Sequence, residues 1–357
     1  MIRLYKPYVF VLLFFVATQS CNKNGTTYTP PEYIPPTVTT FTNPLLSSGP
    51  DPWVIKKDSF YYYTNTSGDK INIWKTKTMS QLGSAPVVTI WTKPATGPNS
   101  ENIWAPELHF IDNKWYMYYT AGTSGDINTV QRLFVLENTS ADPTQGTWVD
   151  KGKVADPAAD FWAIDATVFE QNGSRYILWS GHASDVDFIQ RIYIARLQNP
   201  WTLATGRTLI SSPDYPWEKI GAPAVNEGPE ILKNNNGDPF LIFSASSCFT
   251  DDYSMGMLVL KSGGNPLLAA DWTKSPNPVF GKKPENNAFG PGHGSFFKSP
   301  DGTENWMLYH ANSSANQGCG DVRNPRIQKF TFNADGTPNF GEPVKTGTAI
   351  TKPSGEK

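Results

Sequence analysis

Four carboxylates and one imidazole recur along the chain at intervals of 56, 58, 62 and 66 residues: Asp51, Glu107, Asp165, Glu227 and His293. If the fold brings these carboxylates together, repulsion between like charges raises the pKa of at least one of them. A carboxyl group with a raised pKa can deliver a proton near neutral pH, as general acid catalysis requires. The spacing therefore predicts an acid–base site assembled from five parts of the chain.

Each of these residues begins the same local pattern: a short apolar run, a turn and a bulky aromatic strand. The turns are rich in Asn, Asp, Gly, Ser and Lys, as hairpin turns are. The aromatic strands read YYYT, YMYYT, YILWS, FLIFS and WMLYH. A hairpin cannot bury its apolar face alone, and units of about 60 residues have the length of a four-stranded propeller blade.

Five such units predict an all-β, single-domain, five-bladed β-propeller over residues 43–357. The innermost strand of each blade would lie along the axis, so the five residues above would surround one funnel mouth. The alternative is a β-sandwich in which the spacing is fortuitous.

The composition agrees with this class and excludes others. Aromatic residues make up 13% of the chain and charged residues only 17%, which is unlike a disordered chain or a coiled coil. The 29 glycines and 30 prolines indicate many turns. The net charge is −2 and no block of Lys and Arg exists, so a nucleic acid partner is not expected.

The first 42 residues are expected to serve export. Arg3 and Lys6 precede an apolar run of ten residues, too short to span a bilayer as a stable helix. The following segment, ending in Ser20-Cys21, resembles a bacterial lipoprotein signal, which predicts a signal peptide over residues 1–20 and lipidation of Cys21. Residues 21–42 are Pro-rich and predict an extended linker. The protein would then be anchored to the cell envelope through lipid alone. An ordinary secretory signal is the alternative, with a periplasmic or extracellular protein.

Cys248 and Cys319 are the two remaining cysteines. In an oxidising compartment such a pair predicts a disulfide bond. Two free buried thiols are the alternative; zinc is not expected, because no CxxC or HxxxH spacing accompanies them.

Several motifs resemble those of glycoside hydrolase family 43. They are PDPWV at 50–54, WAPE at 104–107, IDATVF at 164–169, NEGPEIL at 226–232, GPGHGSF at 290–296 and RIQKFTFNADGTPNFGEPV at 326–344. The resemblance extends over roughly residues 44–350, with the motifs in the family's order, and is strongest to its extracellular α-L-arabinofuranosidase branch. It implies a five-bladed propeller and an inverting glycosidase acting on arabinan, arabinoxylan or xylan of plant cell walls, working as a monomer.

The same resemblance implies roles for three residues: Asp51 as general base, Glu227 as general acid and Asp165 as the carboxylate that tunes the acid. Inverting hydrolysis needs an acid and a base about 6.5–9.5 Å apart, with room for water between them. Glu107 and Glu230 are rival acids. Glu107 is expected to have a structural or substrate-hydroxyl role. Glu230 would point to the opposite sheet face unless Gly228 and Pro229 form a bulge.

Other residues are candidates for substrate or ion binding. No cofactor is expected for the chemistry, but the resemblance implies that His293 lines the funnel floor and holds a structural ion, calcium for instance, largely through waters. Arg326, in first place, and Arg323 are expected beside the carboxylates, where an Arg could donate to sugar hydroxyls. His109 and His310 are expected in the core. Further candidates for the rim or for sugar stacking are Trp53, Trp104, Trp162, His182, Asn102 and Phe161.

Three functions remain open from the sequence. The first is an exo-acting α-L-arabinofuranosidase, which releases terminal arabinofuranosyl residues. The second is β-xylosidase or endo-arabinanase chemistry on the same fold. The third is a surface glycan-binding propeller without catalysis, which would not need three acidic residues at one register.

Overall fold

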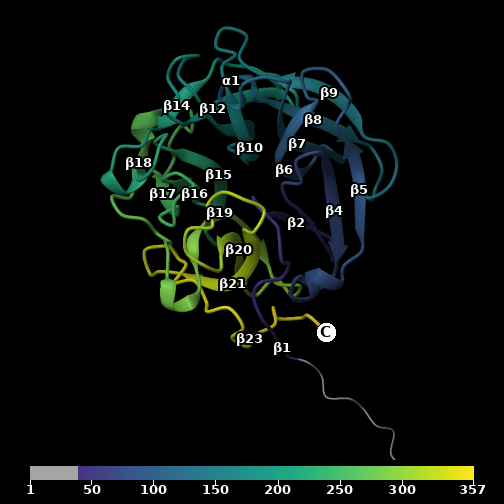
Figure 1. Cartoon of the computed structure of the whole chain (residues 1–357), viewed down its shortest axis with the longest axis vertical. Helices are drawn as coiled ribbons and strands as arrows, with labels where there is room; N and C mark the ends of the chain where they lie inside the picture. The colour runs from purple at the N-terminus through teal and green to yellow at the C-terminus, as the bar shows by residue number, and fades with distance from the viewer. Residues whose placement is uncertain (1–38) are drawn as a thin grey trace, which may run out of the picture. The chain divides into compact units, whose positions relative to one another are not determined.

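Five sheets surround one axis in the computed structural model, which describes residues 39–357 (Figure 1). Each sheet consists of strands that follow one another in the chain and pair antiparallel. The first strand of each sheet contacts the first strand of the next, and the last of them, β19, contacts β2. These contacts close a ring, so the predicted five-bladed propeller is confirmed.

The blades are numbered 1 to 5 in chain order. Blade 1 contains β2 (Trp53–Lys57), β3 (Phe60–Thr64), β4 (Lys70–Thr76) and β5 (Val87–Thr92). Blade 2 contains β6 (Glu101–Ile111), β7 (Lys114–Gly122), β8 (Arg132–Asn138) and β9 (Val149–Val154). Blade 3 contains β10 (Ala163–Gln171), β11 (Ser174–Gly181), β12 (Arg191–Asn199), β13 (Thr202–Leu203) and β14 (Thr208–Ser211). Blade 4 contains β15 (Asn226–Lys233), β16 (Pro239–Ala245), β17 (Ser254–Leu260) and β18 (Trp272–Lys274). Blade 5 contains β19 (Phe289–Lys298), β20 (Asn305–Asn312), β21 (Asn324–Phe332) and β22 (Pro338–Asn339).

Helical structure in residues 39–357 is confined to short connections. These are α1 (Ile127–Val130) and the 3₁₀ turns η1 (Met79–Ser84), η2 (Pro216–Glu218), η3 (Ala269–Asp271) and η4 (Pro284–Asn286). None of the helices in this part of the chain is long and apolar enough to cross a membrane. The predicted signal peptide and Cys21 lie outside the described residues.

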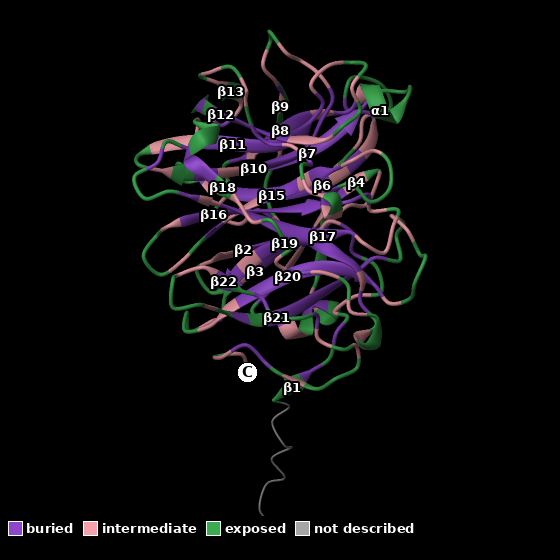
Figure 2. Ribbon diagram, turned by 90° about the vertical axis from the view of Figure 1, so that its left-hand side faces the viewer, coloured by how far each residue is buried: buried purple, intermediate pink, exposed green. Residues whose placement is uncertain are grey.

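The core is divided into five apolar clusters, one between each pair of neighbouring blades. The aromatic second strands supply much of each cluster; Trp115, Tyr118 and Tyr309, for example, are fully buried. Figure 2 shows this as buried strands through the middle of the molecule and exposed connections around it. Burial of both faces explains why these strands read as nearly continuous aromatic and aliphatic runs.

The ends of the propeller domain close the ring together. Strand β1 (Thr40–Phe41) pairs with β23 (Ile350–Thr351). The Asn43 side chain donates to the carbonyl of Ile327 at 2.8 Å and accepts from its amide at 3.0 Å, which fastens the first segment to blade 5. Closure therefore joins residues that are 284 positions apart in the sequence.

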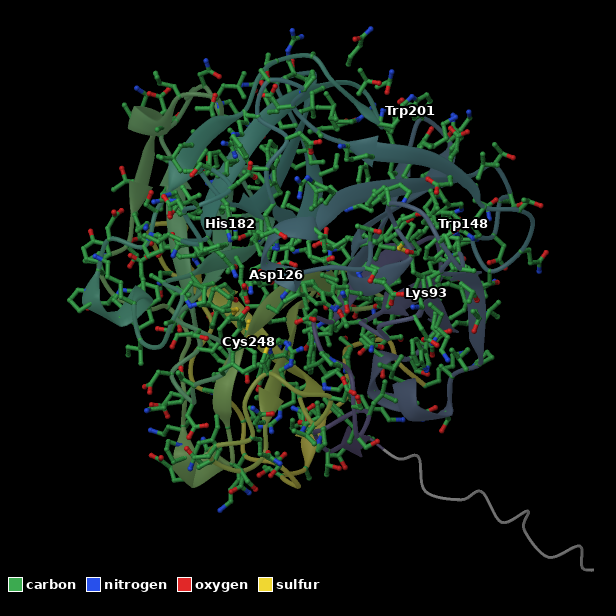
Figure 3. The ribbon with its side chains drawn as sticks, turned by 45° about the horizontal axis from the view of Figure 1, so that its top comes forward. Lys93, Asp126, Trp148, His182, Trp201 and Cys248 are labelled. Atoms are coloured by element: carbon green, nitrogen blue, oxygen red, sulfur yellow. A yellow bond between two sulfur atoms is a disulfide. The ribbon has the colours of Figure 1, made fainter. Side chains whose placement is uncertain are left out.

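Cys248 and Cys319, which are 71 positions apart in the sequence, form the predicted disulfide bond, with Cα atoms 5.0 Å apart. It connects blades 4 and 5. Figure 3 labels Asp126, His182 and Cys248, which lie in the connections that follow the second strands of blades 2, 3 and 4, respectively.

We expect the Cys248→Ser/Cys319→Ser variant to lose about 4 kcal/mol of unfolding free energy, because the bridge restricts a long loop in the unfolded chain. Denaturant unfolding with and without a thiol reductant measures this. The reductant should destabilise the wild-type protein and leave the double variant unchanged. Equal unfolding free energies of the wild-type protein and the double variant, both without reductant, would contradict the expectation.

Candidate active site

In each of blades 2 to 5 the inner strand contains a residue in the left-handed backbone region, and in blade 1 such a residue lies two positions before β2. These residues are Asp51 (φ 53°), Ala105 (φ 40°), Asp165 (φ 58°), Gly228 (φ 52°) and His293 (φ 51°). In blades 2 to 5 the pairing register shifts at the same place. A bulge of this kind bends the strand and changes the direction of its side chains. The fold therefore turns the start of each inner strand toward the axis in the same way.

The bulges correct the register predicted from the sequence. Asp51, Asp165 and His293 are equivalent, as expected. Glu107 lies two residues after the equivalent position in its blade, Ala105, and Glu227 lies one residue before Gly228. Small residues occupy the left-handed position in blades 2 and 4, so the five polar residues do not form one ring.

Four of the five left-handed residues donate their backbone N–H to a side chain of the preceding blade. Asp51 donates to His310 Nδ1 (3.0 Å), Ala105 to Thr66 Oγ1 (2.7 Å), Asp165 to Thr120 Oγ1 (3.1 Å) and His293 to Ser244 Oγ (2.8 Å). The fifth, Gly228, donates to the Asp165 carboxylate at 3.0 Å. None of these acceptors was assigned this role from the sequence. In the sequence, these acceptors are marked by the polar residue at or just after the end of each aromatic strand.

The carboxylate of Asp51 is surrounded by polar side chains of four other residues. Arg323 Nη1 lies 2.7 Å from its Oδ1 and Thr66 Oγ1 lies 2.8 Å from its Oδ2. His293 Nδ1 and His310 Nδ1 lie 3.4 and 3.6 Å from Oδ1. Burial alone would raise the pKa of Asp51, but the charge of Arg323, the two imidazoles and the Thr66 hydrogen bond hold that pKa well below its usual range. Asp51 is therefore a carboxylate at neutral pH.

Glu227 has the opposite character. Burial raises its pKa to about 7, and the negative charge of Asp51 adds to this effect. A hydrogen bond from the Tyr253 hydroxyl to Oε1, at 2.9 Å, opposes the rise, and so does Arg323. The group can thus hold a proton near neutral pH and release it readily.

Asp165 lies with the other two carboxyls. Its pKa is raised well above the usual range by burial and then by the charges of Glu227 and Asp51. The Gly228 amide favours its ionised form. Asp165 accepts from the Gly228 amide, next to Glu227, and the His293 ring lies against both Gly228 and Asp51, so the structure brings Asp51, Asp165 and Glu227 together.

A second acidic pair consists of Glu107 and Glu230. Each lies on its inner strand two residues after the left-handed residue, Ala105 or Gly228. The Gly228 bulge turns Glu230 inward, where its Oε2 accepts from Thr167 Oγ1 (2.9 Å) and Trp53 Nε1 (3.3 Å). Glu107 Oε2 lies 3.1 Å from His109 Nε2. Burial raises the pKa of Glu107 well above its usual range and, with the charge of Glu107, raises that of Glu230 to about 8. All of these contacts are made within the protein, and the expected structural or substrate-hydroxyl role of Glu107 stays a prediction.

His293 was expected to hold an ion. Its ring packs against Gly228, where an added Cβ would lie 3.1 Å from Nδ1, and it faces Asp51. Within residues 39–357 no three His, Cys, Asp or Glu side chains form a group that could bind a metal. Calcium takes six to eight oxygen ligands, so these side chains do not fit a directly coordinated calcium ion, and an ion held through waters stays a prediction.

His310 is buried, as expected for a core residue, but it belongs to the site. Its Nδ1 accepts the Asp51 amide, so the neutral ring carries its hydrogen on Nε2. Nε2 is buried and has no hydrogen-bond partner among residues 39–357. A donor at this place suits a water or substrate oxygen and not a cation.

Arg323, not the favoured Arg326, lies beside the carboxylates. Arg326 is fully buried and donates to oxygens of the protein interior, those of Asn324, Asn287, Asn312 and Ser313. The preference for Arg326 was therefore wrong. Strand β21 begins at Asn324, so Arg323 lies in the connection that reaches the funnel, whereas Arg326 lies within the sheet.

The candidates for sugar contacts differ in how far they are buried. Trp104 is half-buried and directly precedes Ala105, so it remains a candidate sugar contact. Trp162 is buried, stacks on His182 with ring centroids 4.2 Å apart and donates to the Ile127 carbonyl. Trp53 is buried against His109. The carbonyl of Asn102 accepts from Gln131.

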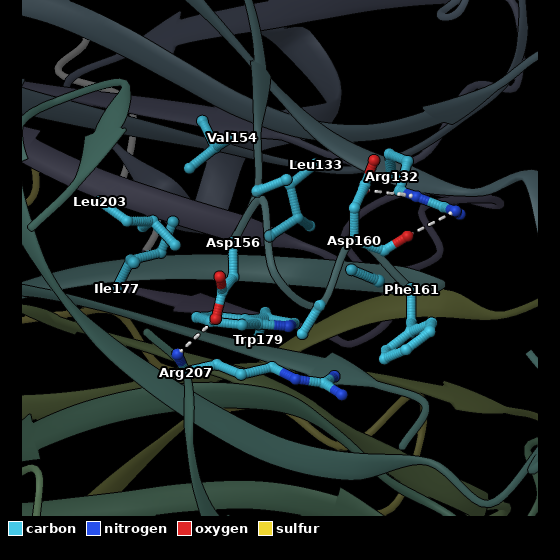
Figure 4. A pocket seen from close by; sticks show the side chains of 13 residues that line it. Arg132, Leu133, Val154, Asp156, Asp160, Phe161, Ile177, Trp179, Leu203 and Arg207 are labelled. Atoms are coloured by element: carbon cyan, nitrogen blue, oxygen red, sulfur yellow. Dashed lines mark hydrogen bonds and ion pairs between the residues drawn. The ribbon is translucent and has the colours of Figure 1, made fainter. Parts of the chain in front are cut away.

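Phe161 lines a separate small cavity between blades 2 and 3 (Figure 4). The charged side chains there have partners within the protein. Arg132 donates to Asp160, and the Asp156 carboxylate accepts from the backbone N–H of Arg207. The Arg207 guanidinium lies over Phe161 and donates to the carbonyls of His182 and Ala183. This cavity belongs to the scaffold of the rim.

Comparison with known proteins agrees with this geometry. Residues 41–338 match the family described as glycosyl hydrolases family 43. An extracellular exo-α-(1→5)-L-arabinofuranosidase of Streptomyces avermitilis is 42% identical over 316 residues, which are 86% of this chain and 64% of that protein. A protein of the same name from Streptomyces chartreusis is 39% identical, over 76% of this chain and 82% of its own length.

A crystal structure of an α-L-arabinofuranosidase from Lactobacillus brevis superposes with a TM-score of 0.80 at 37% identity, covering 86% of this chain and 98% of that one. This chain thus spans only about two thirds of its Streptomyces avermitilis relative but nearly the whole of the Lactobacillus brevis structure. The match along most of the propeller and the shared fold show that the chain belongs to glycosyl hydrolases family 43.

Proposed function

We propose that this protein is an inverting, exo-acting α-L-arabinofuranosidase that releases terminal arabinofuranosyl residues from arabinan or arabinoxylan. One observation carries the proposal: Asp51, paired with Arg323 at 2.7 Å, stays ionised, while burial and the charge of Asp51 raise the pKa of Glu227 to about 7 in the same site. The names of the relatives at 39–42% identity support the choice of sugar.

In this mechanism Asp51 takes a proton from a water molecule, which attacks the anomeric carbon. Glu227 gives its proton to the departing glycosidic oxygen. Asp165, when ionised, favours the protonated form of Glu227 by repulsion between like charges. Arg323 keeps Asp51 ionised, so it remains a base even beside two other carboxyls. Direct displacement by water inverts the anomeric centre.

The alternatives have weaker support. Proteins named as probable endo-1,5-α-L-arabinosidases are 24% identical to this chain over 281 residues. A solved xylan β-1,4-xylosidase from Bacillus halodurans is 17% identical, with a TM-score of 0.67, and so shares the fold alone. A glycan-binding propeller without catalysis would not need an acid and a base with separated pKa values.

We further propose that the protein is exported and anchored to the cell envelope by a lipid on Cys21. Support comes from the sequence of residues 1–21 and from the word "extracellular" in the names of two relatives. Metabolic labelling with a fatty acid tests the anchor, with the Cys21→Ser variant as control.

Proton NMR of a single reaction tests both the sugar and the stereochemistry. We expect an α-L-arabinofuranoside to give the β anomer of arabinose first, before mutarotation mixes the anomers, because water displaces the leaving group directly. The matching β-D-xyloside should react far more slowly. Appearance of the α anomer first would make Asp51 a nucleophile, and a preference for the xyloside would overturn the choice of sugar.

Glu227→Gln should lower kcat on arabino-oligosaccharides by on the order of 10²–10⁴-fold, because the general acid is lost. The loss should be smaller on an aryl arabinofuranoside with an acidic leaving group, which needs little protonation. Glu230→Gln, three residues along the same strand, is the matched control and should not show this dependence on the leaving group. A leaving-group dependence that follows Glu230 would reassign the acid.

The value of kcat/KM should fall as the pH rises through about 7, because Glu227 then loses its proton. The acidic limb should lie below the ordinary carboxyl pKa of about 4, because the pKa of Asp51 is lowered. The Tyr253 hydrogen bond lowers the pKa of Glu227, so Tyr253→Phe should raise that pKa and move the alkaline limb to higher pH. A shift to lower pH would contradict this account of Tyr253.

A further inference from the structure

Two connections of neighbouring blades are joined by the disulfide bond. Residues 246–253 connect β16 to β17 in blade 4, and residues 313–323 connect β20 to β21 in blade 5. Each follows the second strand of its blade and therefore lies at the end of the propeller where the inner strands begin. Besides the Cys248–Cys319 bond, Asn316 donates its amide to Asp251 Oδ1 at 2.9 Å.

Each of these connections leads directly to the residue that holds one of the two carboxyls. Tyr253 follows Cys248 by five residues and donates to Glu227 at 2.9 Å. Arg323 follows Cys319 by four residues and donates to Asp51 at 2.7 Å. The Tyr253 ring also stacks on His310, which accepts the Asp51 amide. The disulfide thus links the partner of the proposed acid to the partner of the proposed base.

Parts of both connections are exposed, although Tyr253 and Arg323 themselves are buried. Phe249, next to Cys248, has 74% of its surface exposed, and Val322, next to Arg323, has 46% exposed. The outer faces of both connections therefore bury little apolar surface. Within its own connection Arg323 is supported by the Gly320 carbonyl, which accepts from its Nε at 3.1 Å. Segments with few buried apolar contacts open more readily than the strands between them.

We propose that the Cys248–Cys319 bridge is a positioning element of the catalytic site, which fixes Tyr253 against Glu227 and Arg323 against Asp51. This inference rests on the proposed function. The bridge touches neither the substrate nor the reacting atoms and acts only through these two side chains. A misplacement of a catalytic group by about 1 Å can cost on the order of 10²-fold in rate.

The test compares the full chain with its Cys248→Ser/Cys319→Ser variant on two substrates, well below the unfolding temperature. We expect kcat on an arabino-oligosaccharide to fall about 10–100-fold with a much smaller change in KM, because positioning and not binding is lost. The fall should be smaller on an aryl arabinofuranoside with an acidic leaving group. An equal fall on both substrates, which a reduced folded fraction would cause, overturns the proposal, and so does an unchanged kcat.

Phe340→Ala is the matched control for stability. Phe340 is buried near the outer edge of blade 5 against Phe296 and Phe330, away from both connections. Its loss destabilises the same blade, but we expect no dependence of the remaining activity on the leaving group. A dependence equal to that of the double Ser variant would attribute the effect to instability and overturn the proposal.

A double-mutant cycle with Tyr253→Phe tests the route of the effect. If the bridge acts through Tyr253, the loss caused by Tyr253→Phe should be clearly smaller in the double Ser background than in the wild type. Fully additive losses would exclude this route.

Reduction of the wild-type protein provides a measurement without substitution. Dithiothreitol becomes a cyclic disulfide while Cys248 and Cys319 become thiols, and kcat on the oligosaccharide should fall and return after reoxidation. Unchanged activity after complete reduction, counted by thiol titration, overturns the proposal. If the oxidised wild-type protein cleaves no arabinofuranoside at all, the proposed function fails instead.

Discussion

The structure depends on one repeated constraint. The left-handed residue in or just before each inner strand needs a hydrogen-bond acceptor for its backbone N–H. A bulge removes this amide from the ladder of its own sheet, and a buried amide without a partner costs about as much as a lost hydrogen bond. In four blades the acceptor is a side chain at or just after the end of the preceding blade's second strand, as with Thr120 for Asp165. Each such bond ties one blade to the next, so the geometry of the axis and the closure of the ring support one another.

The exception to this pattern creates the site. In blade 3 the equivalent hydroxyl, that of Ser180, donates to the Asn226 carbonyl, and the Gly228 amide is left for the Asp165 carboxylate. Asp165 is thereby held beside Glu227 by the same kind of bond that elsewhere only joins blades. Because position 228 is glycine, the His293 ring can approach the backbone there, where a Cβ would lie 3.1 Å from Nδ1.

Two carboxyls of similar chemistry acquire different protonation because the structure distributes positive charge unevenly. The Arg323 guanidinium donates to Asp51 at 2.7 Å, whereas the side chain that donates to Glu227 is the neutral Tyr253. Burial raises the pKa of both groups, but only Asp51 has enough positive charge beside it to reverse the effect. The proposed acid and base thus differ in protonation because of their surroundings and not because of residue type.

The sequence by itself determined the propeller, the disulfide bond and the family. Periodic turns, aromatic strands and an even pair of cysteines are local or countable features, and they suffice to predict blades, their number and a bridge. Asp51, Asp165 and Glu227 were identified because their motifs resemble those of the family.

Only the tertiary structure decided the partners of these residues. Arg323 and Arg326 are three residues apart, and the place where β21 begins decides which of them reaches Asp51. His310 was expected in the core, yet it accepts the Asp51 amide from the neighbouring blade, and Tyr253 reaches Glu227 from a connection of the same blade. The positions of Glu107 and Glu227 relative to the bulge also depend on which residue adopts the left-handed conformation. These outcomes depend on contacts between segments as much as 272 residues apart, and no local pattern in the chain specifies such contacts.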